Sequence, residues 1–106
     1  MTFDEFITNV YNFNDAIGSV KTKNFGLQLS CLIEELGEMT EAINKDSGTL
    51  HAMEEWADVL YVLLGVPFVM GWPTEFVREA LKQVARKNAA KLEKKLSYSS
   101  TGKLLK

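Results

Sequence analysis

Apolar side chains recur at intervals of three and four positions along most of the chain, which is the period of an amphipathic α-helix. The first such stretch follows Thr2, a residue type that caps helices, and it places Phe3, Phe6 and Val10 on one side. The pattern predicts four helices, within about residues 1–20, 24–44, 50–65 or a little beyond, and 75–96. The expected fold class is therefore all-α.

Short breaks separate the last three predicted helices. The turn signal Asp46-Ser47-Gly48 joins the second helix to the third and should fold the two antiparallel, as a hairpin. Pro67 should end or kink the third helix, because proline lacks a backbone donor and clashes with the preceding turn. Gly71-Trp72-Pro73 then interrupts the chain before the fourth helix.

The length of the chain predicts one domain with a modest core. All 106 residues should form a single domain, with its core at 24–96 and a flexible tail at 97–106. Small helical chains often complete their core by self-association. We therefore expect a four-helix fold that is completed in a homodimer or a homotetramer.

The composition favours a cytoplasmic protein without a membrane partner. Asp4 and Glu5 stand where a signal peptide would be basic, and the apolar run 59–72 is too short to span a bilayer. The single cysteine, Cys31, excludes an intrachain disulfide and fits a reducing compartment. We interpret Cys31 as a small core residue, because the only histidine, His51, is expected in a distant turn.

The small net charge of −2 hides two regions of opposite charge. Residues 1–75 hold three basic and twelve acidic side chains, whereas residues 76–106 hold nine basic and two acidic ones. An acidic half beside a basic half suits an anionic substrate that carries a metal ion. A nucleic acid is not expected as a partner, because the acidic half would repel its phosphates.

Two carboxylate clusters carry the candidate chemistry. The clusters are Glu34-Glu35-Leu36-Gly37-Glu38 and Glu54-Glu55-Trp56-Ala57-Asp58. Residues three or four apart share one face of a helix, so Glu35 can point the same way as Glu38, and Glu55 the same way as Asp58. A spacing of four gives a second possible pairing, of Glu34 with Glu38 and of Glu54 with Asp58. The predicted hairpin should bring both clusters together.

One residue within the first cluster is unusual for a helix. Gly37 disfavours a helix and therefore indicates close approach by another helix or a ligand.

The surroundings of the second cluster favour a metal site. Asp58 lies in the run 56–64, which is apolar on nearly every side and is expected to be buried. Buried carboxylates must be paired, protonated or bound to a cation, and Lys45 is the only lysine or arginine between positions 24 and 77. Hard oxygen ligands suit Mg²⁺ or Mn²⁺. A solvated acidic face is the alternative, and it fits Glu41 well.

The two clusters also resemble a known signature. The order E-E-x-x-E, sixteen residues, then E-x-x-D is similar to that of the MazG-like all-α nucleoside triphosphate pyrophosphohydrolases, over about residues 26–92. The resemblance implies a four-helix MazG-like bundle. It also implies a Mg²⁺-dependent hydrolase that cuts the α–β phosphate bond of a nucleotide, releases a nucleoside monophosphate and pyrophosphate, and serves nucleotide-pool house-cleaning.

The same resemblance suggests roles for single residues. Glu35, Glu38, Glu55 and Asp58 would hold Mg²⁺, and Glu34 would hold a further metal or orient the attacking water. Asn88 and Lys91 resemble an N-x-x-K element that holds substrate phosphate, which suits an amide donor and an ammonium.

Alternatives remain open for the substrate and for the presence of chemistry. The tail 102–106 is similar to a G-K-x-x-K ending found in a phosphoribosyl-ATP pyrophosphohydrolase-like branch, so this activity is one alternative. The base and sugar of a nucleotide substrate are not specified by the sequence. A helical assembly protein without catalysis is the second alternative.

Overall fold

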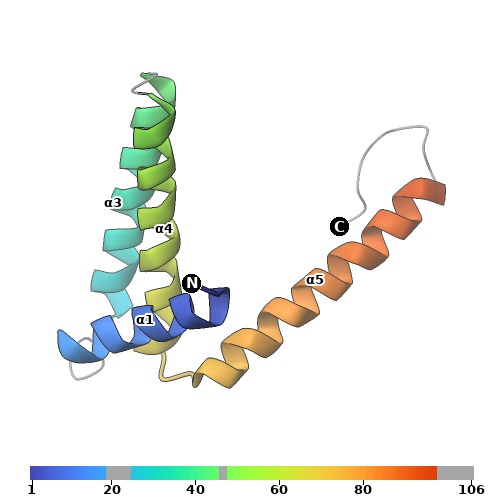
Figure 1. Ribbon diagram of the computed structural model, residues 1–106, viewed down its shortest axis with the longest axis horizontal. Helices are drawn as coiled ribbons and strands as arrows, with labels where there is room; N and C mark the ends of the chain where they lie inside the picture. The colour runs from blue at the N-terminus through green and yellow to red at the C-terminus, as the bar shows by residue number, and fades with distance from the viewer. Residues whose placement is uncertain (19–24, 46–47, 98–106) are drawn as a thin grey trace. The chain divides into compact units, whose positions relative to one another are not determined.

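The computed structural model describes residues 1–18, 25–45 and 48–97, with side chains as far as Lys95. Within these residues the chain forms four α-helices and no strand, which confirms the all-α class (Figure 1). The helices are α1 (Phe3–Ala16), α3 (Phe25–Asn44), α4 (Thr49–Val69) and α5 (Thr74–Ser97).

The chain divides into two compact units. Residues Met1–Thr74 form the first unit, with α1, α3 and α4, and Glu75–Lys106 form the second, of which α5 is described. The single domain over residues 1–106 therefore stays a prediction. Of the tail predicted at 97–106, only Ser97, the last residue of α5, lies within the described residues.

Helix α1 begins at a complete capping box. The Thr2 hydroxyl accepts from the Glu5 backbone N–H at 3.1 Å, and the Glu5 carboxylate accepts from the Thr2 N–H at 3.2 Å. The helix ends at Ala16, where Gly18 adopts a φ of 77° that other residues rarely take. The helix therefore lies within the predicted range 1–20.

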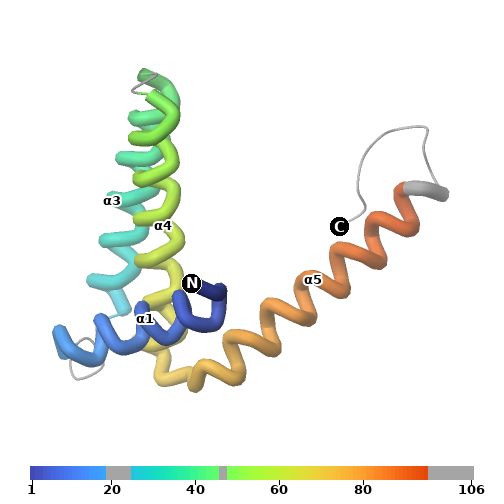
Figure 2. Tube along the Cα trace, viewed as in Figure 1, coloured from blue at the N-terminus to red at the C-terminus, as the bar shows by residue number. Residues whose placement is uncertain are grey.

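Helices α3 and α4 form the predicted antiparallel hairpin, and they lie side by side over most of their length (Figures 1 and 2). Ala42 is buried where the two helices meet. The turn residues Asp46 and Ser47 lie outside the described part of the chain. The hairpin places the two carboxylate clusters on neighbouring helices.

Helix α4 passes through Pro67 and continues to Val69, a little beyond the end predicted near Gly65. Pro67 lies in the last turn, so the missing donor costs a single hydrogen bond there. The chain also caps this end, because the Trp72 N–H donates to the Pro67 carbonyl at 2.9 Å. Leu64 and Val69 are buried on either side of the proline, and their packing offsets its cost.

Helix α1 packs on the C-terminal half of α4 through aromatic side chains. The ring of Tyr61 meets Phe6 and Phe13 edge-on, at centroid distances of 5.7 and 5.6 Å. The Tyr61 hydroxyl also donates to the Asn9 side-chain oxygen at 2.9 Å. Ile7 of the same helix is fully buried. The first helix thus holds the open end of the hairpin.

Three helices meet at Gly65. The Gln28 amide of α3 crosses over this glycine and donates to the Val62 carbonyl at 2.7 Å. Asn14 of α1 is buried beside it and donates to the Val10 carbonyl at 2.9 Å. A Cβ atom on Gly65 would overlap the Gln28 side-chain nitrogen. Only a glycine allows both amides to approach α4 this closely.

No helix in the described part of the chain combines the length and the apolarity that a membrane crossing requires.

Candidate metal centre

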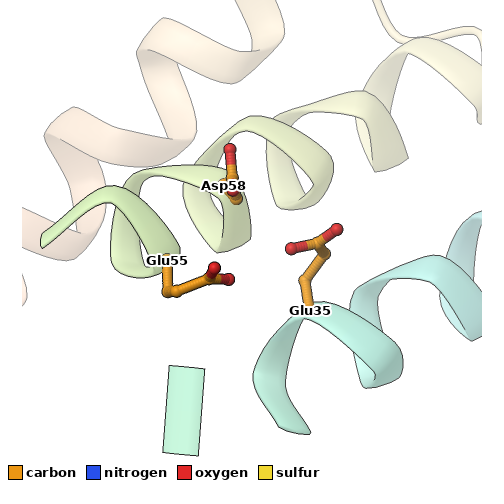
Figure 3. Close-up of side chains that lie close together, drawn as sticks. All are labelled: Glu35, Glu55 and Asp58. Atoms are coloured by element: carbon orange, nitrogen blue, oxygen red, sulfur yellow. The ribbon is translucent and has the colours of Figure 1, made fainter. Parts of the chain in front are cut away.

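The hairpin gathers three acidic side chains at one point between α3 and α4. Glu35 extends from α3, and Glu55 and Asp58 extend from α4 toward it (Figure 3). One carboxylate oxygen from each of the three residues lies within 4.8 Å of the other two. These three residues form the acidic triad.

The positions of the triad follow from the helical period. Glu55 and Asp58 are three residues apart, so they share one side of α4. Glu35 lies two turns from Ala42, the buried residue at the contact between the helices, and therefore also faces α4. The antiparallel hairpin then sets the middle of α3 against the middle of α4, which confirms that these two clusters meet.

The two glutamates of the triad are partly buried, whereas its aspartate is exposed. Glu35 and Glu55 are half-buried, and the Oε2 atom of each is buried without a hydrogen-bond partner among the described residues. Such atoms are costly unless something satisfies them. Asp58 is exposed, so the burial predicted for it was wrong. Helix α4 has neighbours on only part of its circumference, which also leaves Trp56 59% exposed.

The electrostatics of Glu35 show that its charge is not compensated. Burial raises the pKa of its carboxyl above the ordinary value of 4.5, and the negative charges of Glu38, Asp58 and Glu55 raise it further. A hydrogen bond with Glu38 acts in the same direction. The metal-free site therefore stabilises the protonated form of Glu35 and repels additional negative charge.

His51 is a neighbour of the triad, although it was predicted to lie in a distant turn. It lies in the first turn of α4, not in a distant turn, and its Nε2 atom is 3.8 Å from Glu55 Oε1. The spacing of four between His51 and Glu55 was the signal that could have revealed it. A cavity of about 210 Å³ lies here, and its lining consists of Glu38, Glu41, Ala42, Lys45, His51 and Glu55.

Lys45 does not neutralise the triad. Its ammonium donates to Glu41 Oε1 at 2.6 Å on the exposed surface of α3. This pair lowers the pKa of Glu41, as a solvated surface ion pair does. Glu41 thus behaves as the solvated acidic residue that the sequence indicated.

The other predicted residues of the first cluster lie outside the triad. Glu38 is exposed beside Glu35 and contributes to its raised pKa. Glu34 is exposed on α3 and is not among the three residues whose oxygens meet. Around Gly37, an added Cβ would meet nothing within 4 Å, so the predicted close approach by another helix is wrong for the described chain.

The predicted phosphate residues belong to the second unit. Asn88 and Lys91 are three apart on α5, which gives them one face of that helix. Asn88 is exposed and donates through Nδ2 to the Val84 carbonyl at 3.0 Å, and Lys91 is half-buried.

The acidic triad fits a hard divalent cation. Its donors are carboxylate oxygens, the atoms that Mg²⁺ and Mn²⁺ prefer. The unpartnered oxygens of Glu35 and Glu55 supply ligand atoms that no described residue satisfies. A cation would also remove the repulsion that raises the pKa of Glu35.

Comparison of the chain with protein-family models, with curated proteins and with solved structures finds no significant match. The geometry of the triad and the spacing of the two clusters are therefore the grounds for a functional proposal.

The raised pKa of Glu35 predicts how the metal-free protein responds to pH. The folded state binds the Glu35 proton more tightly than the unfolded chain. This contribution to stability is full below pH 4.5 and is lost as the pH rises through the folded-state pKa. Glu35→Gln should therefore melt higher than the wild type at pH 7 in a chelator, and the difference should shrink toward pH 4.

The same variant separates the carboxylate from the cation. Millimolar Mg²⁺ should raise the melting temperature of the wild type by mass action, and it should raise that of Glu35→Gln much less. The control is Glu41→Gln, which removes a solvated carboxylate on the same helix. It should keep the full increase in melting temperature with Mg²⁺. Thermal melts with and without Mg²⁺ measure these responses. An equal increase in melting temperature in all three proteins would show that the triad binds no cation.

Proposed function

We propose that this protein is a nucleotide pyrophosphohydrolase that depends on Mg²⁺ or Mn²⁺, related to the MazG-like enzymes. It would cleave the α–β phosphate bond of a nucleoside triphosphate or a similar nucleotide and release a monophosphate and pyrophosphate. The observation that carries the proposal is the convergence of Glu35, Glu55 and Asp58 with two buried, unpartnered oxygens. The spacing of the two clusters supports it.

Each acidic side chain of the site would have its own role in the reaction. Glu35, Glu55 and Asp58 would hold the cation, and Glu38, whose charge already acts on Glu35, would extend the ligand set. A bound Mg²⁺ would offset charge on the phosphates and lower the pKa of an attacking water. Glu34, exposed at the edge of the cluster, would orient that water or hold a further ion.

Helix α5 would contribute to binding of the substrate. Seven of its side chains are basic and three are acidic, so its charge is complementary to a polyphosphate. Lys91 would pair with a phosphate oxygen and Asn88 would donate a hydrogen bond to one. The working state that we propose is a homodimer or a homotetramer in the cytoplasm.

A panel of nucleotides tests the proposed activity. Canonical (d)NTPs, oxidised nucleotides and phosphoribosyl-ATP would each be incubated with the protein and Mg²⁺, and pyrophosphate release would be measured. At least one should be hydrolysed, and a chelator should abolish the reaction. Preference for phosphoribosyl-ATP would assign the alternative activity. No release from any nucleotide, with no Mg²⁺ effect on melting, would instead support the assembly protein.

Lys91→Ala should weaken substrate capture without altering the metal site. The variant removes one charge-assisted contact, worth about 1.5–3 kcal/mol, so kcat/KM should fall roughly tenfold or more. The Mg²⁺ effect on melting should be unchanged. Lys94→Ala is the control, because Lys94 is an exposed cation one turn further along α5. If both variants lose the same modest amount and salt removes it, α5 only attracts anions.

A further inference from the structure

A histidine lies beside the acidic triad in the first turn of α4. The Nε2 atom of His51 is 3.8 Å from Oε1 of Glu55, and the two residues are about one helical turn apart. The sequence contains no other histidine. Both residues line the cavity of about 210 Å³ that Glu38 also borders. An imidazole nitrogen and a carboxylate of the triad are therefore next to the same small space.

The distance between these two atoms is not that of a hydrogen bond. A nitrogen that donates to an oxygen lies roughly 2.7–3.2 Å from it, whereas His51 Nε2 and Glu55 Oε1 are 3.8 Å apart. Two atoms that bind one metal ion can be further apart, because each bond is about 2.0–2.2 Å long and the ion lies between them. Separations up to about 4.2 Å, twice such a bond length, therefore suit a shared ion.

The carboxylate of Glu55 connects the histidine with the triad. Its Oε1 lies near His51, and its Oε2 is buried without a hydrogen-bond partner among the described residues. The side chain of Glu55 is 16% exposed, whereas that of His51 is 50% exposed. The carboxylate is thus held in the interior, and the imidazole is open to an ion that arrives from water. A cation bound to Glu55 Oε1 is within reach of the Nε2 atom.

The remaining basic side chain of the cavity does not take this place. Lys45 lines the same cavity, but its ammonium donates to Glu41 at 2.6 Å on the surface of α3. It therefore does not compensate the charge of Glu55. A cation beside His51 and Glu55 would meet no ammonium held against the same carboxylate.

An imidazole changes which cation a carboxylate site prefers. Carboxylate oxygens suit Mg²⁺ and Mn²⁺, whereas an imidazole nitrogen suits later transition-metal ions such as Co²⁺, Ni²⁺ and Zn²⁺. Ligands at positions i and i+4 lie on one face of a helix, and the helical zinc motif of metalloproteases uses this spacing. His51 and Glu55 have the same spacing on α4.

We propose that His51 is a nitrogen ligand of the metal centre and that it shifts the preference of the centre from Mg²⁺ toward a transition-metal ion such as Co²⁺ or Zn²⁺. Glu35, Glu55 and Asp58 supply the oxygen ligands. The inference rests on the cation site of the proposed function but not on hydrolysis of a nucleotide. His51 lies between the two acidic clusters, so their spacing alone does not reveal it.

Calorimetric titration of the full chain, produced without a histidine tag, tests the proposal. Dissociation constants would be measured for Mg²⁺, Co²⁺ and Zn²⁺ in the wild type and in His51→Gln. The variant should bind Co²⁺ and Zn²⁺ at least about tenfold more weakly, and Mg²⁺ with nearly unchanged affinity. Glu54→Gln is the matched control, because Glu54 is exposed three residues from His51 and does not line the cavity. It should bind all three ions as the wild type does.

Nuclear magnetic resonance distinguishes a direct bond from an effect of nearby charge. Because the chain has one histidine, its imidazole gives one pair of ¹⁵N signals. Zn²⁺ should shift the Nε2 signal of His51 more than the Nδ1 signal, and Mg²⁺ should leave both almost unchanged. Circular dichroism would verify that the helices of each variant remain.

Three results would overturn the proposal. They are an Nε2 signal that does not respond to Zn²⁺, unchanged binding of all three ions by His51→Gln, and equal losses in His51→Gln and Glu54→Gln. If Mg²⁺ still binds the wild type in these cases, the proposed metal centre stands without His51. If the wild type binds none of the ions, the role of His51 and the proposed metal centre both fail.

Discussion

Glu55→Gln and Asp58→Asn should each lower the turnover of an accepted nucleotide by at least about a hundredfold. Each change removes the charge of a triad oxygen but preserves the volume of the side chain, so the hairpin should still form. A cation that loses one of three carboxylate ligands is bound more weakly and is positioned less well. Turnover would be measured at saturating Mg²⁺, with circular dichroism to verify that the helices remain.

Glu54→Gln provides the control for this prediction. Glu54 is the exposed neighbour of Glu55, and the substitution makes the same change of charge one position away. Because Glu54 is not a member of the triad, its variant should keep nearly all of the activity. Activity close to that of the wild type in Glu55→Gln and Asp58→Asn would remove the triad from the reaction. Equal losses in all three variants would indicate a general effect of negative charge.

Gly65→Ala should lower the free energy of unfolding by about 1–3 kcal/mol, although alanine favours a helix over glycine. The new methyl group would occupy the space of the Gln28 amide and would break its hydrogen bond to the Val62 carbonyl. The Asn14 amide, 3.3 Å from the same point, limits the movement that could relieve the overlap. Urea denaturation of the wild type and the variant measures the difference.

Gly37→Ala is the opposite case on the neighbouring helix. Nothing lies within 4 Å of a Cβ at Gly37, so this change should stabilise the protein by about 0.5–1 kcal/mol through helix propensity alone. Gln28→Ala should then remove most of the cost of Gly65→Ala in a double-mutant cycle. If Gly65→Ala is neutral in both backgrounds, the close approach of the two amides to α4 does not exist in solution.

The hairpin and the meeting of the two carboxylate clusters could be predicted from the sequence. Spacings of three within each helix and one turn between the helices are sufficient to place Glu35 opposite Glu55 and Asp58. These relations are local, so they do not depend on the rest of the fold. The same reasoning could not tell that Glu38 and Glu34 lie outside the triad, because the rotation of each helix about its axis is set by packing.

Properties that depend on packing were the ones predicted wrongly. The apolar run around Asp58 indicated burial, but burial requires neighbours on every side, and the described chain supplies them on only part of α4. The exact end of α4 also depends on packing, because buried neighbours and a capped end allow the helix to pass Pro67 and continue to Val69. His51 was assigned to a turn although it lay at the very start of the helix predicted from residue 50, where local propensity defines a boundary poorly. Because α4 begins at Thr49, His51 lies in its first turn.

All three members of the triad come from helices that follow one another along the chain, and this has a consequence for how the protein folds. Contacts between neighbouring helices have a low contact order, so they form early and at a small cost in loop entropy. The chain is also synthesised from its N-terminus, and domains begin to fold as they emerge. Glu35, Glu55 and Asp58 can therefore come together, and a cation can stabilise the hairpin, at an early stage of folding.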